Sequence, residues 1–145
     1  SLVLRRVPDT MLDQWLMPET LQRVPEDHRA LFRDLVRSNC AFPQDAEIWS
    51  RILFTDEPLS QPEEVLAEES YYRAALAAHE THPSDYAGFL QGLKETSGAK
   101  GRGLFMPLRM ALTGRHDGPE LAHLYQLLSS ERLVHRLTSP IALKD

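Results

Sequence analysis

Cysteine is scarce in this sequence, and long apolar runs are missing. The 145 residues include one cysteine, Cys40, and no apolar run approaches the length needed to cross a bilayer. A single cysteine excludes an internal disulfide and fits a reducing compartment, so we expect Cys40 to be a small buried apolar group rather than a nucleophile. The apolar start at residues 2–4 is too short for the core of a secretion signal. These absences exclude a disulfide-stapled or membrane-spanning protein and favour a cytoplasmic one.

Motifs for nucleotide, metal and hydrolytic chemistry are also missing. The glycine-containing stretch 98–103 has neither the Gly-Lys-Ser/Thr ending of a phosphate-binding P-loop nor the third glycine of a dinucleotide-binding loop. His79 and His82 flank a turn, but no cysteine or second histidine pair completes a metal site, so we expect both at the surface. No Ser-His-Asp or Cys-His set stands out, which leaves a small hydrolase with little support. We therefore expect no metal, no cofactor and no catalytic activity in this chain alone.

The fold class follows from periodicity and from the places of the prolines. Hydrophobic residues make up 42% of the chain and charged residues 26%, as in an ordinary globular domain. Most prolines stand close to acidic or capping residues that start helices. Apolar residues recur at helical spacing, and no segment alternates convincingly as a strand would. We predict an all-α fold, a compact bundle or cage of about seven to nine helices, with a division into two small helical subdomains left open.

Start signals place several of the helices. A helix over 43–54 would turn Ile48 and Trp49 inward, with Trp49 as a core anchor. Ser60 and Glu63 have the spacing of a capping box, which predicts a helix from there to about residue 78. Ser84-Asp85 would cap a helix that Gly98 ends. Ser130-Glu131 would cap the last helix, with Leu133, Val134 and Leu137 inside and Arg132 and Arg136 outside.

We expect residues 1–145 to form one domain. Its first helical half would span residues 26–95 and its second half residues 96–145, the half that holds most of the candidate site. The first 25 residues are unassigned: their short helix over 9–17 could be a segment between domains or simply one end of the chain.

Positive charge is concentrated in one stretch. Residues 94–116 hold five Lys/Arg and one acid, a charge of +4, so the rest of a chain of net charge -5 carries -9. A positive island on an acidic chain indicates selective contact with an anion.

This basic stretch also has a pattern of loops and helices. Gly101 and Gly103 would let the backbone approach a partner, and Gly114 is placed to end a helix in the left-handed conformation. Pro107 would mark the irregular first turn of the helix between them. One helix face would hold Leu104, Phe105, Leu108 and Leu112 in the core, and the other face Met106, Arg109, Met110 and Thr113.

A second helix start follows the basic stretch. Residues 117–120 are interpreted as a cap with Pro119 in the first turn of a new helix, whose exposed amides would favour an acceptor such as phosphate or a base edge. A well-packed helical hairpin with solvated basic residues explains the same pattern. The residues alone leave both interpretations open.

Residues 96–121 closely resemble the C-terminal anticodon-binding domain of bacterial glutamyl-tRNA synthetases. A Lys-Gly-(Lys/Arg)-x-Leu-Phe-Met-Pro-Leu-Arg-x-Ala-Leu-Thr-Gly run, followed by Gly-Pro-Glu-Leu, is typical of that family. This chain has the run at 100–114 and the second motif at 118–121. The resemblance extends more loosely over about residues 30–138.

The resemblance implies which residues contact RNA. Lys100 and Arg102 match the flanking basic loop of this family. The positions that line its anticodon pocket are matched by Arg109, Gly118, Pro119 and Leu121. Arg115 adds a further cation that could meet a phosphate.

Two places in the sequence depart from the family pattern. Where a member has Arg-x-Arg, with the second arginine on the first anticodon base, this chain has Arg37-Ser38-Asn39, so either Arg37 or Asn39 would face that base. Discrimination of tRNA(Glu) from tRNA(Gln) is therefore left open. Ser129-Ser130 likewise stands where many relatives have glycine.

The resemblance thus implies a monomeric RNA-binding module that recognises the anticodon loop of tRNA(Glu). It would support glutamylation by a catalytic domain in cis that these residues do not include. The His-Ile-Gly-His-like and Lys-Met-Ser-Lys-like motifs of that domain are missing from this sequence, so ATP and Mg²⁺ are expected only there. The alternative is a stand-alone protein-interaction or regulatory domain that docks on a synthetase through its acidic face without binding RNA.

Overall fold

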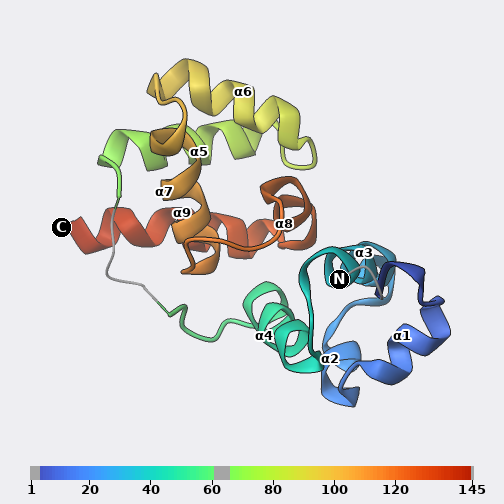
Figure 1. Cartoon of the computed structure of the whole chain (residues 1–145). Helices are drawn as coiled ribbons and strands as arrows, with labels where there is room; N and C mark the ends of the chain where they lie inside the picture. The colour runs from blue at the N-terminus through green and yellow to red at the C-terminus, as the bar shows by residue number, and fades with distance from the viewer. Residues whose placement is uncertain (1–3, 61–65, 145) are drawn as a thin grey trace. The chain divides into compact units, whose positions relative to one another are not determined.

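A computed structural model describes residues 4–60 and 66–144 (Figure 1). Within these ranges the chain forms nine α-helices, two 3-10 helices and no strand. The predicted all-α class and the number of helices are confirmed. The elements in order are η1 (Leu4–Arg6), α1 (Asp9–Trp15), α2 (Pro18–Arg23), η2 (Glu26–His28), α3 (Arg29–Asn39), α4 (Pro43–Phe54), α5 (Glu69–Thr81), α6 (Tyr86–Ser97), α7 (Arg102–Thr113), α8 (Leu121–Leu127) and α9 (Ser130–Lys144).

The contacts divide the chain into two compact units, each made of two segments. Unit 1 comprises residues 1–57 and 118–127, and unit 2 comprises residues 58–117 and 128–145. Position 96, where the sequence analysis separates two helical halves, lies inside unit 2. Because contact density alone defines these units, the expected organisation as one domain over residues 1–145 stays a prediction.

Unit 1 is built on α3 and α4. α2 packs against α4, and α3 contacts α8 and both 3-10 helices. α4 begins at Pro43, and the Asp45 carboxylate accepts hydrogen bonds from the backbone N–H groups of residues 41 and 42 at that end. Trp49 is buried as predicted, but Ile48 is 39% exposed, so its predicted inward orientation is wrong. The buried stripe of α4 is Ala46, Trp49, Ser50 and Leu53, and position 48 lies beside it.

Unit 1 also contains the buried Cys40 and two ion pairs between α1 and α3. Cys40 is buried, and burial raises the pKa of its thiol to about 12, which fits the predicted apolar role. Arg33 donates from Nε and Nη2 to the Asp13 carboxylate at 2.9 and 2.8 Å, and Arg37 pairs with Asp9 at 2.6 Å. These pairs join α1 to α3.

Unit 2 is built around α5 and α9. α6 runs alongside α5 (Figure 1), while α9 packs against both α5 and α7. The buried Tyr71 hydroxyl of α5 donates to the Leu104 carbonyl of α7. The Asp85 carboxylate accepts from the Gly88 N–H at the start of α6, and Gly98, with φ of 71°, follows its last residue. Both ends of α6 are therefore as predicted.

Two predictions about unit 2 are wrong. The helix predicted to start at the capping box of Ser60 and Glu63 starts later: residues 66–68 are not helical, and α5 begins at Glu69. The Ser60 hydroxyl instead donates to the Gly114 carbonyl at 2.9 Å. Glu63 lies outside the described residues. His79 is 3% exposed and its Nε2 lies 2.8 Å from Ser130 Oγ, so it joins α5 to α9 instead of facing solvent. His82 is partly exposed, with Nδ1 3.6 Å from the Asp85 carboxylate.

The side chain of Arg136 is buried, although the sequence predicts that it faces outward. It is only 6% exposed, and its Nη1 donates to the Leu112 carbonyl at 2.9 Å, whereas Val134 is 43% exposed. Both predicted orientations on this helix are wrong. Because α9 packs against two helices, it buries positions 133, 136, 137 and 140, an arc that includes Arg136 and leaves out Val134. The arginine thereby supplies a donor and a positive charge at the C-terminal end of α7.

Replacing Asp13 by asparagine tests the pair between α1 and α3. The hydrogen bond from Arg33 holds the pKa of Asp13 below its usual value. A carboxyl group with a depressed folded-state pKa stabilises the fold above its unfolded-state pKa of about 3.9, and this contribution is lost as the pH falls through the folded-state value. Asp13→Asn should therefore lower the free energy of unfolding at neutral pH, but much less at an acidic pH below the lowered pKa of Asp13 in the folded state.

Urea denaturation at both pH values would measure this effect. Asp34→Asn, an exposed carboxylate of α3, is the matched control and should change little at either pH. Equal destabilisation by Asp13→Asn at both pH values would show that the charge is irrelevant.

Replacing Arg136 tests the contact between α9 and α7. Arg136→Met keeps most of the apolar stem but removes the donor to the Leu112 carbonyl, and should cost about 1.5–3 kcal/mol of unfolding free energy. Arg136→Lys should lose less, since an ammonium can still donate. Arg73→Met, at a largely exposed arginine of α5, is the control for denaturant unfolding. Equal losses at positions 73 and 136 would contradict a special role for the buried guanidinium.

Candidate nucleic-acid interface

Helix α7 carries the central candidate residue, Arg109. The helix follows Gly101, with φ of 57°, and is followed by Gly114, with φ of 70°, conformations that favour glycine. The prediction for Gly114 is confirmed. Pro107 lies inside the helix, not in its first turn as predicted. Since proline has no N–H, it cannot donate to the carbonyl of Gly103 one turn earlier.

The buried surface of α7 is wider than one stripe. Leu104, Leu108 and Leu112 are buried as predicted. Phe105, predicted to face the core, is 39% exposed, while Met110 and Thr113, predicted for the outer face, are 4% and 1% exposed. The Thr113 hydroxyl donates to the Arg109 carbonyl at 2.8 Å and accepts from the Arg115 N–H at 3.0 Å, which satisfies it inside the fold. The helix is therefore packed on more than one side.

Arg109 is half-buried. Burial is the largest influence and lowers the pKa of its guanidinium, while the nearby Asp117 and Tyr86 counteract this effect. The group stays charged, because arginine titrates far above neutral pH. A partly dehydrated guanidinium offers a planar set of donors that match a base edge or a phosphate.

Three other cations lie on or next to α7 in unit 2. Lys100 and Arg102 are exposed at its start, and Arg115 is half-buried just beyond its end. Exposed lysine and arginine side chains can neutralise phosphates without selecting a sequence. Unit 2 therefore combines two half-buried arginines, Arg109 and Arg115, with two exposed cations at the start of α7.

The motif at 118–121 belongs to unit 1. α8 begins at Leu121, and its first backbone hydrogen bonds are accepted by the Glu120 carbonyl, so Pro119 precedes the helix and Asp117 is not its cap. The predicted cap and first-turn proline are wrong. Gly118 is exposed with φ of 142°, whereas Pro119 and Leu121 are buried. The predicted RNA-contacting role of these residues stays a prediction.

Arg37 and Asn39 both have contacts within unit 1. Arg37 donates from Nη2 to the Val7 carbonyl at 2.9 Å and to the Asp9 carboxylate at 2.6 Å. Asn39 is exposed, and its Nδ2 donates to the Leu35 carbonyl at 2.9 Å. The pairing of Arg37 with α1 could not be foreseen from the Arg-x-Asn pattern, because the partners are about 30 residues away in sequence.

A cleft beside the start of α7 includes residues that the sequence analysis did not select. Its volume is about 310 Å³, and Arg102 is the one candidate residue among its lining side chains. The lining residues are Leu66, Arg102, Gly103, Met106, Pro107 and His116. Residues 66 and 116 lie far from α7's first turn in sequence, so no local motif could have placed them there.

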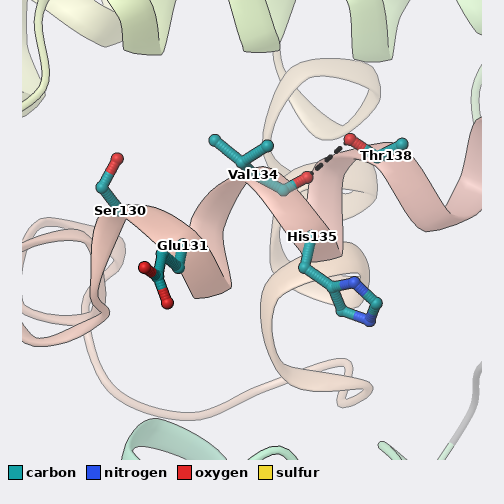
Figure 2. A pocket seen from close by; sticks show the side chains of 5 residues that line it. All are labelled: Ser130, Glu131, Val134, His135 and Thr138. Atoms are coloured by element: carbon teal, nitrogen blue, oxygen red, sulfur yellow. Dashed lines mark hydrogen bonds between the residues drawn. The ribbon is translucent and has the colours of Figure 1, made fainter.

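A larger hollow of about 500 Å³ lies on α9 (Figure 2). All five lining side chains come from successive turns of this one helix, and Thr138 donates to the Val134 carbonyl at 2.7 Å. None of the predicted RNA-contacting residues lines this hollow, which spans Ser130, Glu131, Val134, His135 and Thr138.

Membrane-spanning helices and metal-binding clusters are both absent from the part of the chain that the structure describes. No helix over residues 4–60 and 66–144 has the length and apolar character needed to cross a bilayer. Within the same ranges, no group of three or more His, Cys, Asp or Glu side chains is arranged to hold a metal ion.

Comparison with known proteins gives the family. A family profile described as "Anticodon binding domain" matches residues 14–141. The chain is 53% identical over 141 residues to glutamate–tRNA ligase 1 of Methylococcus capsulatus, covering 94% of this chain and 30% of that protein. It is 40% identical over 131 residues to glutamate–tRNA ligase 2 of Nitrosococcus oceani, covering 87% and 28%. A third relative, glutamate–tRNA ligase 2 of Coxiella burnetii, is 32% identical over 136 residues, covering 91% and 29%.

The chain spans less than a third of the length of these relatives. The match nevertheless covers most of this chain, including α7 and the motif at 118–121. The chain belongs to the family of anticodon-binding domains, in the form that glutamate–tRNA ligases contain.

Proposed function

We propose that this chain binds tRNA(Glu) at its anticodon loop and so supports glutamylation of that tRNA. The observation that carries the proposal is the half-buried Arg109 on α7, the helix that also has the exposed Lys100 and Arg102 at its start, in a member of the anticodon-binding family. Unpaired loop bases present their Watson–Crick edges, which a planar guanidinium can bind, while exposed cations bind the phosphates.

The chemistry of glutamylation would lie in a catalytic domain on the same polypeptide. The relatives are glutamate–tRNA ligases more than three times as long as the matched region. We propose that ATP and Mg²⁺ act in that catalytic domain and that this module, a monomer in the cytoplasm, contributes RNA affinity and selectivity. It then needs no cofactor of its own.

Reading of the first anticodon base is proposed to depend on residues 37–39. To reach a base, Arg37 would have to exchange its contacts with Val7 and Asp9 for RNA contacts. Asn39 is exposed and can offer its amide more easily. Asn39 is thus the better placed of the two, and whether tRNA(Gln) is also bound depends on this position.

The alternative, a protein-interaction domain that uses an acidic face, has less support. Several acids of unit 1 are already paired within the unit: Asp9 with Arg37, Asp13 with Arg33, and Glu47 with Arg23. No observation on the described residues favours a protein partner over RNA.

Replacing Arg109 tests base readout. If the guanidinium binds a base edge, both Arg109→Ala and Arg109→Lys should weaken binding to the cognate anticodon stem-loop by about 1–3 kcal/mol, because an ammonium cannot reproduce the forked donors. The loss should be smaller for a stem-loop with a scrambled anticodon. Fluorescence anisotropy with both RNAs measures the difference, and melting curves check the folding of each variant.

Arg73→Ala is the matched control, since it removes a largely exposed arginine from the same unit. If Arg109→Lys binds the cognate stem-loop as tightly as the wild type, or if Arg109→Ala loses the same affinity for both RNAs, Arg109 contacts a phosphate instead of a base.

The salt dependence of binding tests the phosphate contacts. Two to four contacts on an acidic protein imply a Kd that is roughly micromolar or weaker and a log–log salt slope of about -1 to -3. Lys100→Ala should weaken binding to the cognate and the scrambled stem-loop alike, and it should make the salt slope shallower by about 1. A nanomolar complex that is insensitive to salt would contradict this interface.

A further inference from the structure

We propose that the buried contact between His79 and Ser130 makes the packing of α9 on α5 sensitive to mild acid. When His79 gains a second proton, the first turns of α9 open. The proposal concerns unit 2 alone and goes beyond RNA binding, because it describes a conformational change of the chain by itself. The contact could not be foreseen from the sequence, which predicts His79 at the surface.

The geometry places His79 inside the contact between two helices. The residue lies in the last turn of α5 and is 3% exposed. Its Nε2 lies 2.8 Å from the hydroxyl oxygen of Ser130, the first residue of α9 (Figure 2). Because α9 packs against α5, this hydrogen bond ties the N-terminal end of α9 to the C-terminal end of its neighbour.

A neutral imidazole suits this site and an imidazolium does not. The neutral ring has one donor and one acceptor nitrogen, and a serine hydroxyl can serve either of them. A second proton creates a full charge that burial penalises, and burial accordingly lowers the pKa of His79. The N-terminal end of α9 adds the positive end of a helix dipole, which opposes a further positive charge at Ser130.

The charged groups around this contact do not compensate for the proton. The first two turns of α9 carry Glu131, Arg132, His135 and Arg136, and the turn after α5 and the first residue of α6 carry His82, Asp85 and Tyr86. Burial is the one cause of the lowered pKa of His79, and none of these groups counteracts it. Among the described residues, the charge on an imidazolium at this position is therefore not neutralised.

The sign of the pH dependence follows from the lowered pKa. An unfolded chain takes up the proton near the ordinary histidine pKa of about 6.5, before the folded chain does. The neutral contact therefore contributes its full stabilisation above that pH. The stabilisation is lost as the pH falls from there through the lower pKa of the folded state.

Opening of this end of α9 would also affect α7. Arg136 lies less than two turns beyond Ser130 on α9, and its Nη1 donates to the Leu112 carbonyl near the end of α7. A shift of the first turns of α9 away from α5 would therefore remove support from this second contact.

His79→Gln is the variant that tests the proposal, since a glutamine amide can keep a hydrogen bond to Ser130 but cannot gain a proton in this range. His135→Gln is the matched control, because it replaces an exposed histidine of α9. Urea denaturation of the 145-residue chain is measured at about pH 7.5 and about pH 5.5, on either side of the unfolded-state pKa. The urea midpoint should shift downward in acid for the wild type and for His135→Gln, and clearly less for His79→Gln.

Hydrogen exchange locates the opening. After correction for the intrinsic exchange rates, the wild-type amides of residues 133–137 should lose more protection at the acidic pH than those of α6, and this difference should shrink in His79→Gln. An NMR titration of the His79 imidazole in the wild type gives its pKa directly, which should lie below the ordinary value even if the variant folds poorly.

Three results would overturn the proposal. The first is an equal acid shift of the urea midpoint in the wild type and in a folded His79→Gln. The second is a measured pKa of His79 at or above the ordinary histidine value. The third is an equal loss of protection over α6 and α9, since that is global unfolding and not an opening of α9. No RNA is present in these measurements, so the proposed function stands or falls separately.

Discussion

The candidate RNA surface depends on how the C-terminal end of α7 is held. The Leu112 carbonyl accepts from the buried Arg136 guanidinium, and the Gly114 carbonyl accepts from Ser60, so side chains from distant parts of the sequence satisfy the end of this helix. A cation at a helix C terminus also opposes the negative end of the helix dipole. Thr113 then fixes the backbone of Arg115 through its hydroxyl. These hydrogen bonds hold the backbone segment that carries Arg109 and Arg115.

Features determined by local chemistry could be predicted from the sequence. Gly98 and Gly114 end their helices with positive φ, and Asp85 caps α6 with its own carboxylate, because each needs only neighbours within four residues. Trp49 is buried for a related reason, since the apolar stripe of an amphipathic helix faces the core. The fold class follows because many such local preferences agree.

Features determined by the number of neighbouring helices could not be predicted in this way. Periodicity assumes that a helix buries one stripe, but α7 and α9 are each packed on more than one side, so Thr113 and Arg136 are buried although each is polar. Arg136 is satisfied by the Leu112 carbonyl of another helix, whereas Thr113 donates to the Arg109 carbonyl of its own helix. The same reasoning applies to His79, whose partner Ser130 is 51 residues away.

The cations on and around α7 differ in hydration, and this difference bears on selectivity. Lys100 and Arg102 are exposed, so water and salt screen their attraction for a phosphate, and they favour any polyanion alike. Arg109 has already lost part of its hydration within unit 2 and is influenced by Asp117. A partly dehydrated donor has less water to give up on binding, and it gains most from a partner whose acceptors match its geometry. In the proposed function, selectivity would therefore depend on burial around Arg109, whereas the exposed cations would mainly set the affinity and its response to salt.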